Sequence, residues 1–86
     1  MDTATVLGML AARLRRALPA TVDATRRATL RLAANHPSRA ARSVSLDLDG
    51  HPVRVVEVDG YQVVVDDLGR LRGVYADPAL RMLLPA

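Results

Sequence analysis

The sequence predicts an α+β fold, in which an N-terminal helical region precedes a four-stranded antiparallel β-meander and a short C-terminal helix. Apolar residues recur at helical spacing up to about residue 34, then alternate with polar residues, and Asp-Gly pairs separate the later apolar runs. Helices followed by a run of strands are typical of the α+β class. With 86 residues, we expect one domain over 1–86, comprising a basic helical part at 1–42 and the meander with its short helix at 43–86.

The N-terminal region is predicted to be two helices or one kinked helix. The first begins after Asp2, whose carboxylate can accept backbone hydrogen bonds, and ends or bends at Pro19, which has no N–H to donate. Its apolar stripe consists of Val6, Leu7, Leu10, Ala11, Leu14, Ala17 and Leu18. The second is expected from about Ala20 to Ala34, with a narrow face suited to close helix packing: Ala20, Ala24, Ala28 and Leu32.

Four strands are expected after residue 43. The first, at 44–48, alternates apolar and polar residues, as a strand with one buried face does. Asp49-Gly50 and Asp59-Gly60 are hairpin signals on either side of a second strand at 53–58. Because its valines do not alternate, this strand should contain a β-bulge or be buried on both faces. The remaining elements are expected as a strand at 61–65, a turn at 66–69, a strand at 71–75, and a helix at 79–84 that begins after the Asp77-Pro78 cap.

The core of so short a chain is small. It must be built from Leu, Val and Ala, because the sequence has no Phe, Trp or Cys. Dimerisation is a common remedy for a thin core, so we expect a homodimer that buries either the valine-rich strands or the narrow face of the second helix. No apolar run approaches the roughly 18 to 20 residues that span a bilayer, and residues 1–8 do not resemble a secretory signal. We therefore expect no membrane contact and a cytoplasmic location.

No motif in the sequence supports catalysis, a cofactor or a metal. The segment 46–50, LDLDG, resembles the first strand and loop of haloacid-dehalogenase-type phosphotransferases, but the chain has no lysine to act as the cationic partner. His36 and His51 are the only histidines, too few for a zinc site without cysteine. An EF-hand register on Gly50 puts Val56 where a bidentate glutamate is needed. We expect a protein that binds without catalysing.

Arginine is distributed unevenly along the chain. The formal net charge is only +3, yet residues 1–42 carry eight arginines and two aspartates, a charge of +6, whereas residues 43–86 carry four arginines and seven acidic residues, a charge of −3. A guanidinium is permanently charged and its fork of donors suits phosphate. We therefore expect contacts with the DNA backbone from the arginines of the two helices: Arg13, Arg15, Arg16, Arg26, Arg27 and Arg31.

Residues 61–80, YQVVVDDLGRLRGVYADPAL, resemble part of the YbaB/EbfC nucleoid-associated proteins. The common elements are a valine-rich strand, a glycine turn, a second strand and an Asp-Pro helix start, and the spacing from Gly69 to Asp77-Pro78 agrees. Members of that family are small dimers with a long N-terminal helix, and they bind DNA. The resemblance implies the same function for this chain but assigns no contact residue.

Two hypotheses about function follow from these observations. The first is a dimeric protein that binds the DNA backbone through an arginine-rich helical face. The alternative is a protein-interaction module, such as an adaptor, a chaperone or an immunity-type protein, whose basic helices bind an acidic partner or the acidic sheet of a second copy. The salt dependence of binding to random duplex DNA distinguishes the two.

Overall fold

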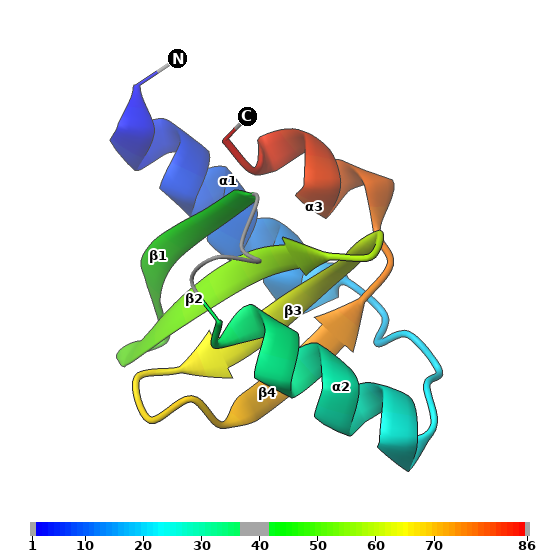
Figure 1. Cartoon of the computed structure of the whole chain (residues 1–86). Helices are drawn as coiled ribbons and strands as arrows, with labels where there is room; N and C mark the ends of the chain where they lie inside the picture. Colours follow the sequence, from blue (N-terminus) through cyan, green and yellow to red (C-terminus); the bar gives the residue numbers. More distant parts are fainter. Residues whose placement is uncertain (1, 37–41, 86) are drawn as a thin grey trace.

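A computed structural model of the protein describes residues 2–36 and 42–85. A four-stranded antiparallel sheet forms the centre of the molecule (Figure 1). Two helices, α1 (Thr3–Arg16) and α3 (Pro78–Leu83), cover one face of the sheet, and a third, α2 (Ala24–Ala34), covers the other. The predicted α+β class is confirmed. In chain order the elements are α1 (Thr3–Arg16), α2 (Ala24–Ala34), β1 (Arg42–Leu48), β2 (His51–Val58), β3 (Tyr61–Asp66), β4 (Leu71–Tyr75) and α3 (Pro78–Leu83).

Both Asp-Gly pairs form the tight hairpin turns that the sequence predicts. Asp49 and Gly50 have φ values of 54° and 85°, and Asp59 and Gly60 have values of 51° and 82°. Two successive residues with positive φ match the right-handed twist of the flanking strands. The strands therefore pair in sequence order, from β1 at one edge to β4 at the other.

The central strands β2 and β3 are buried on both faces, which is why their valines do not alternate with polar residues. Val55 and Val64 pack with α1 and α3, whereas Val56 and Val63 pack with α2. Of the two expectations for strand 53–58, burial on both faces is confirmed. A shift in strand register of the kind that a β-bulge produces occurs elsewhere, in the pairing of β3 with β4 between Val64 and Val65.

Helix α1 confirms the first predicted helix and most of its stripe. Asp2 accepts a hydrogen bond from the Thr5 N–H at 2.7 Å, and Leu10 and Leu14 are buried against the sheet. The placement of Leu18 in this stripe is wrong, because the helix ends at Arg16 and the Leu18 side chain is 86% exposed. Two separate helices, rather than one kinked helix, form the N-terminal region.

Helix α2 begins four residues later than predicted. Its N-cap is Asp23, which accepts a hydrogen bond from the Arg26 N–H at 2.7 Å. The N–H of Ala20 instead donates to the carbonyl of Val74 at 2.8 Å, so residue 20 lies at the β4 edge and not in a helix. The expected face of small residues is thus wrong at Ala20, and its other members, Ala24, Ala28 and Leu32, are exposed.

The Asp77-Pro78 cap starts α3 as predicted. Asp77 accepts a hydrogen bond from the Ala79 N–H at 2.9 Å, and its own N–H donates to the buried side chain of Gln62 at 2.7 Å. At the other end of α3, Arg42 donates to the carbonyls of Arg81 and Leu84 at 3.0 and 2.7 Å. The N-terminus of this short helix is therefore capped by Asp77, and its last carbonyls are satisfied by Arg42 of β1.

Candidate functional site

The six arginines predicted to contact DNA lie on opposite sides of the sheet. Arg13, Arg15 and Arg16 are in the last turn of α1, and the other three, Arg26, Arg27 and Arg31, are in α2. Since α1 and α2 cover different faces (Figure 1), the structure does not bring the six together on one surface. The candidate site is therefore divided into an α1 part and an α2 part.

Two of the three α1 arginines form ion pairs with other described residues. Arg13 binds Asp77, with Nε and Nη2 at 3.0 and 2.9 Å from Oδ2, and Arg15 binds Asp49, with Nε and Nη2 at 3.1 and 2.8 Å from Oδ1. The hydrogen bond from Arg15 lowers the pKa of Asp49. Cations in the last turn of a helix also stabilise its C-terminus through the helix dipole. The presence of Arg13 and Arg15 is thus explained by ion pairs that stabilise the fold.

The α2 arginines differ from these two. Arg26, Arg27 and Arg31 are all exposed, and α2 itself contains no acidic residue. Within residues 2–36 and 42–85, none of the three forms an ion pair. Their guanidinium groups therefore face solvent with their charge uncompensated by a contacting carboxylate from the described chain.

Helix α2 also has an uncovered stripe of small and apolar side chains. It consists of Ala24, Ala28 and Leu32, and the Leu32 side chain is 64% exposed. The inner face of the helix packs through Leu30 and Ala34 instead. The close helix contact that the sequence predicts for this stripe is not made within the described residues.

A second surface, which the sequence pattern does not predict, lies between α1 and α3. Met9 and Met82, which are 43% and 83% exposed, line a groove of about 400 Å³ together with Ala12, Ala79 and Leu83. Arg13 and Arg16 complete its lining. The only signal in the sequence is that both methionines lie outside the buried stripes of their helices, and α1 and α3 are too far apart in the chain for their pairing to be inferred.

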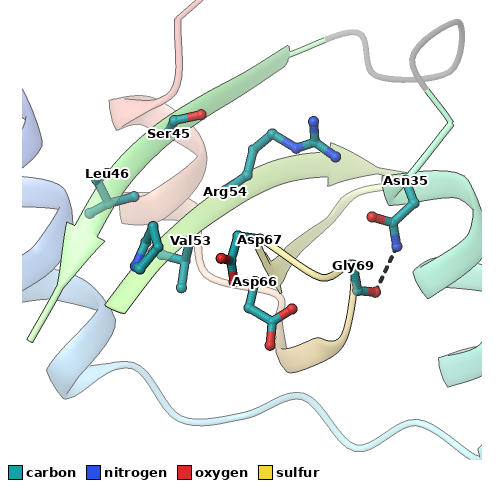
Figure 2. Close-up of a pocket in the computed structure, with 9 residues that line it drawn as sticks. Asn35, Ser45, Leu46, Val53, Arg54, Asp66, Asp67 and Gly69 are labelled. Carbon is teal, nitrogen blue, oxygen red and sulfur yellow. Dashed lines mark hydrogen bonds between the residues drawn. The ribbon is translucent and has the colours of Figure 1, made fainter. Parts of the chain in front are cut away.

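A polar recess of about 270 Å³ lies where the end of α2 meets β1 and the β3–β4 turn (Figure 2). Three of its polar side chains form hydrogen bonds with other parts of the chain. Arg54 donates to the Ala34 carbonyl at 3.1 Å, and Asn35 donates to the Gly69 carbonyl at 2.9 Å. Asp66 accepts hydrogen bonds from the backbone and side chain of Arg70. The hydrogen bonds of Arg54 and Asn35 thus hold the C-terminus of α2 against the sheet and the β3–β4 turn.

Metal-ligating side chains do not cluster among the residues that the structure describes. No group of three or more His, Asp and Glu side chains at residues 2–36 and 42–85 could hold a metal ion. Asp47 and Asp49 of the LDLDG segment serve the first hairpin, in which the Gly50 N–H donates to Asp47 at 2.7 Å. Among the described helices, none is long and apolar enough to cross a membrane.

Comparison of the chain with protein-family models, with curated proteins and with solved structures finds no match. The resemblance of residues 61–80 to the YbaB/EbfC proteins stays a prediction. Function must therefore be inferred from the surfaces themselves, of which the α2 arginines and the α1–α3 groove are the most distinctive.

Proposed function

We propose that the protein binds the DNA backbone, without catalysing a reaction, through the outer surface of α2. One observation carries this proposal: Arg26, Arg27 and Arg31 are exposed on a helix without acidic residues and form no ion pair within residues 2–36 and 42–85. Such guanidinium groups can bind phosphate without first losing a partner inside the protein. The resemblance to nucleoid-associated proteins supports the same function.

The placement of the arginines on opposite sides of the sheet reduces the number of residues that can contact one DNA duplex. A straight duplex lying against α2 does not reach the arginines of α1 in the same chain, because the sheet separates the two helices. Arg13 and Arg15 would also have to share their charge with Asp77 and Asp49. We therefore assign the phosphate contacts to α2 and reduce the expected role of α1.

A homodimer would strengthen this binding. Three phosphate contacts give a slope of log K against log salt of about −2.7, and two copies double it. The helices of each chain cover both faces of its central valine-rich strands, and the uncovered Ala24, Ala28 and Leu32 stripe is on the helix that carries the proposed phosphate contacts. The dimer would therefore need a surface that leaves the arginines of α2 accessible. We expect light scattering at high micromolar concentration to give the mass of two chains, and a monomer mass would contradict this part of the proposal.

The test is fluorescence anisotropy of a labelled random duplex over a range of salt concentrations. We expect wild-type protein to bind at ~50 mM salt and micromolar concentration with a steep salt dependence. The variant with Arg26, Arg27 and Arg31 changed to Gln should bind weakly, and its slope should be shallower by about 0.9 for each phosphate that it no longer binds. Glutamine is a good helix former, so α2 should persist.

The matched control removes the same charge from the opposite face. In this variant Arg13, Arg15 and Arg16 become Gln, and circular dichroism verifies that it is folded. Its salt slope should remain close to that of the wild type. If wild-type protein does not bind at ~50 mM salt, the proposal fails; if only the α1 variant has a shallower slope, the assignment to α2 is wrong.

A further inference from the structure

The groove between α1 and α3 is apolar at one end and basic at the other. Met9 precedes Arg13 by one helical turn, and Met82 lies about one turn beyond Asp77, the residue that Arg13 binds. The two arginines are therefore at the end where α1 stops and α3 begins, and the two methionines are toward the other end. No acidic side chain is among the groove's described lining residues.

The methionines are exposed because the buried sides of their helices are already occupied. Leu10 and Leu14 of α1, with Leu80 and Leu84 at α3, fill the space above the sheet and are 0% to 5% exposed. Met9 and Met82 lie off these stripes and point away from the core. Methionine is flexible and polarisable, and it is common on surfaces that bind varied apolar partners. Their pairing in one groove indicates a contact surface.

The charges at the groove argue against a second copy of this chain as its occupant. In a two-fold symmetric contact the patch meets itself with its ends reversed, so the basic end of each copy would lie against the apolar methionine end of the other, and Arg13 and Arg16 would gain no acidic partner. Arg16 forms no ion pair with the described residues, and the Arg13 side chain remains 44% exposed beside its partner. The occupant that complements both ends of the groove is apolar along one side and acidic at one end.

We propose that the groove is a docking site for an acidic amphipathic helix of a partner protein. The seven-residue interval from Met9 to Arg16 corresponds to about 10 Å of helix, or two turns. A partner helix of that length presents apolar side chains at positions i, i+4 and i+7, the usual pattern of helix-in-groove binding. Its apolar side chains cover Met9 and Met82, and a carboxylate at its acidic end pairs with Arg16, while Arg13 keeps its ion pair with Asp77. This surface is independent of the proposed DNA contact, which lies on the opposite side of the sheet.

The experiment uses a designed, labelled peptide of about 18 residues, long enough to form a helix. Leucines line one side, glutamates flank them, and alanines fill the rest. A second peptide of the same composition, with leucines and glutamates in scrambled order, has the same charge but no apolar face. We expect the amphipathic peptide to bind the full chain with a Kd below about 1 mM, the scale of a weak specific contact, and the scrambled peptide at least tenfold more weakly.

Two protein variants locate the site. Met82→Glu should weaken peptide binding by about tenfold or more, because it places a carboxylate in the apolar end. Arg16→Gln should weaken it by about two- to fivefold and reduce its salt dependence, as expected for an exposed ion pair. The matched controls, Leu32→Glu and Arg27→Gln on α2, should leave peptide binding unchanged, and thermal melting should show all four variants folded.

Each alternative outcome overturns the proposal. Equal binding of both peptides would mean that charge alone attracts them, without an apolar groove. Equally weakened binding in the groove and control variants would move the contact elsewhere. If no peptide binds and light scattering shows self-association that Met82→Glu abolishes, the occupant is a second copy and not a foreign helix. None of these results affects the duplex-binding test of α2.

Discussion

At the residue scale, Asp77 connects three elements that are distant in the sequence. Its carboxylate caps α3 and binds Arg13 of α1, while its N–H donates to Gln62 of β3. Burial acts to raise the pKa of Asp77, but the hydrogen bonds from Arg13 and from the N–H of Ala79 outweigh it and lower the pKa below its ordinary value. The charged form is therefore the one that stabilises the fold.

This lowered pKa predicts a pH-dependent contribution to stability. A carboxyl group whose folded pKa is depressed stabilises the fold fully above its unfolded pKa, about 3.9, and loses that contribution as the pH falls through the folded value. Asp77→Asn keeps a capping side chain but removes the charge. We expect it to lower the free energy of unfolding at pH 7 by about 1 kcal/mol or less, because the Arg13 side chain is 44% exposed to solvent.

Urea unfolding of both proteins at pH 7 and near pH 2.5 measures the effect. The difference between wild type and Asp77→Asn should shrink at the lower pH, because the charge of Asp77 is lost as the pH falls through its lowered pKa. Comparing the two proteins removes the contributions of other aspartates with lowered pKa values, such as Asp2 and Asp49. A difference that stays the same at both pH values would show that the Asp77 charge contributes nothing.

At the element scale, the C-terminus of α2 depends on the β3–β4 turn. Asn35 donates to the carbonyls of Arg31 and Gly69, both at 2.9 Å, so one side chain joins the helix end to the turn. Gly69 has a φ of 77°, and a Cβ there would lie 3.0 Å from the Asn35 Oδ1. Glycine is required at this position both for its backbone conformation and for the close approach of Asn35.

We predict that Gly69→Ala destabilises the protein by about 1 to 3 kcal/mol, from the strained backbone and from the displacement of Asn35. Gly8→Ala is the matched control, because Gly8 is inside α1 and a Cβ there has nothing within 4 Å. That change should instead stabilise the protein by about 0.5 to 1 kcal/mol. Urea unfolding measures both, and two changes of the same sign would contradict the role given to Gly69.

At the scale of the whole molecule, the sheet separates two cores. One contains Leu10, Leu80 and Val64, and the other contains Leu30, Ala34 and Val63. Val63 and Val64 are adjacent in β3 and are 0% and 3% exposed, so one residue type at two neighbouring positions supports different helices. This layering also places the α2 arginines and the α1–α3 groove on opposite sides.

The two valines therefore predict separable effects. Val63→Ala and Val64→Ala should each cost about 2 kcal/mol, from the removed methyl groups and the cavity left behind. Amide hydrogen exchange should show a greater decrease of protection in α2 for Val63→Ala, and in α1 and α3 for Val64→Ala. An equal decrease throughout both variants would mean that the layers open only together.

Much of the fold could be predicted because its determinants are local. Asp2 and the Asp77-Pro78 pair mark helix starts through the hydrogen bonds of their own carboxylates, and both Asp-Gly pairs adopt turns set by backbone conformation. The errors concern Ala20, whose conformation a distant strand decided, and Leu18, which lies beyond the point where α1 ends. Ala20 binds the β4 edge and so is not helical, and Leu18 follows the last turn of α1 and remains exposed.

The candidate site depends more strongly on tertiary structure than the fold class does. By itself, the sequence determined the arginine-rich composition of the helical part, the order of the elements and the hairpin register. Only the tertiary structure decided that α1 and α2 cover opposite faces, that Asp77 and Asp49 pair with Arg13 and Arg15, and that Met9 and Met82 share a groove. Patterns of charge and periodicity describe residues that are close together in the chain. Packing brings together segments that are far apart in the sequence, and no local pattern shows which of these segments will be in contact.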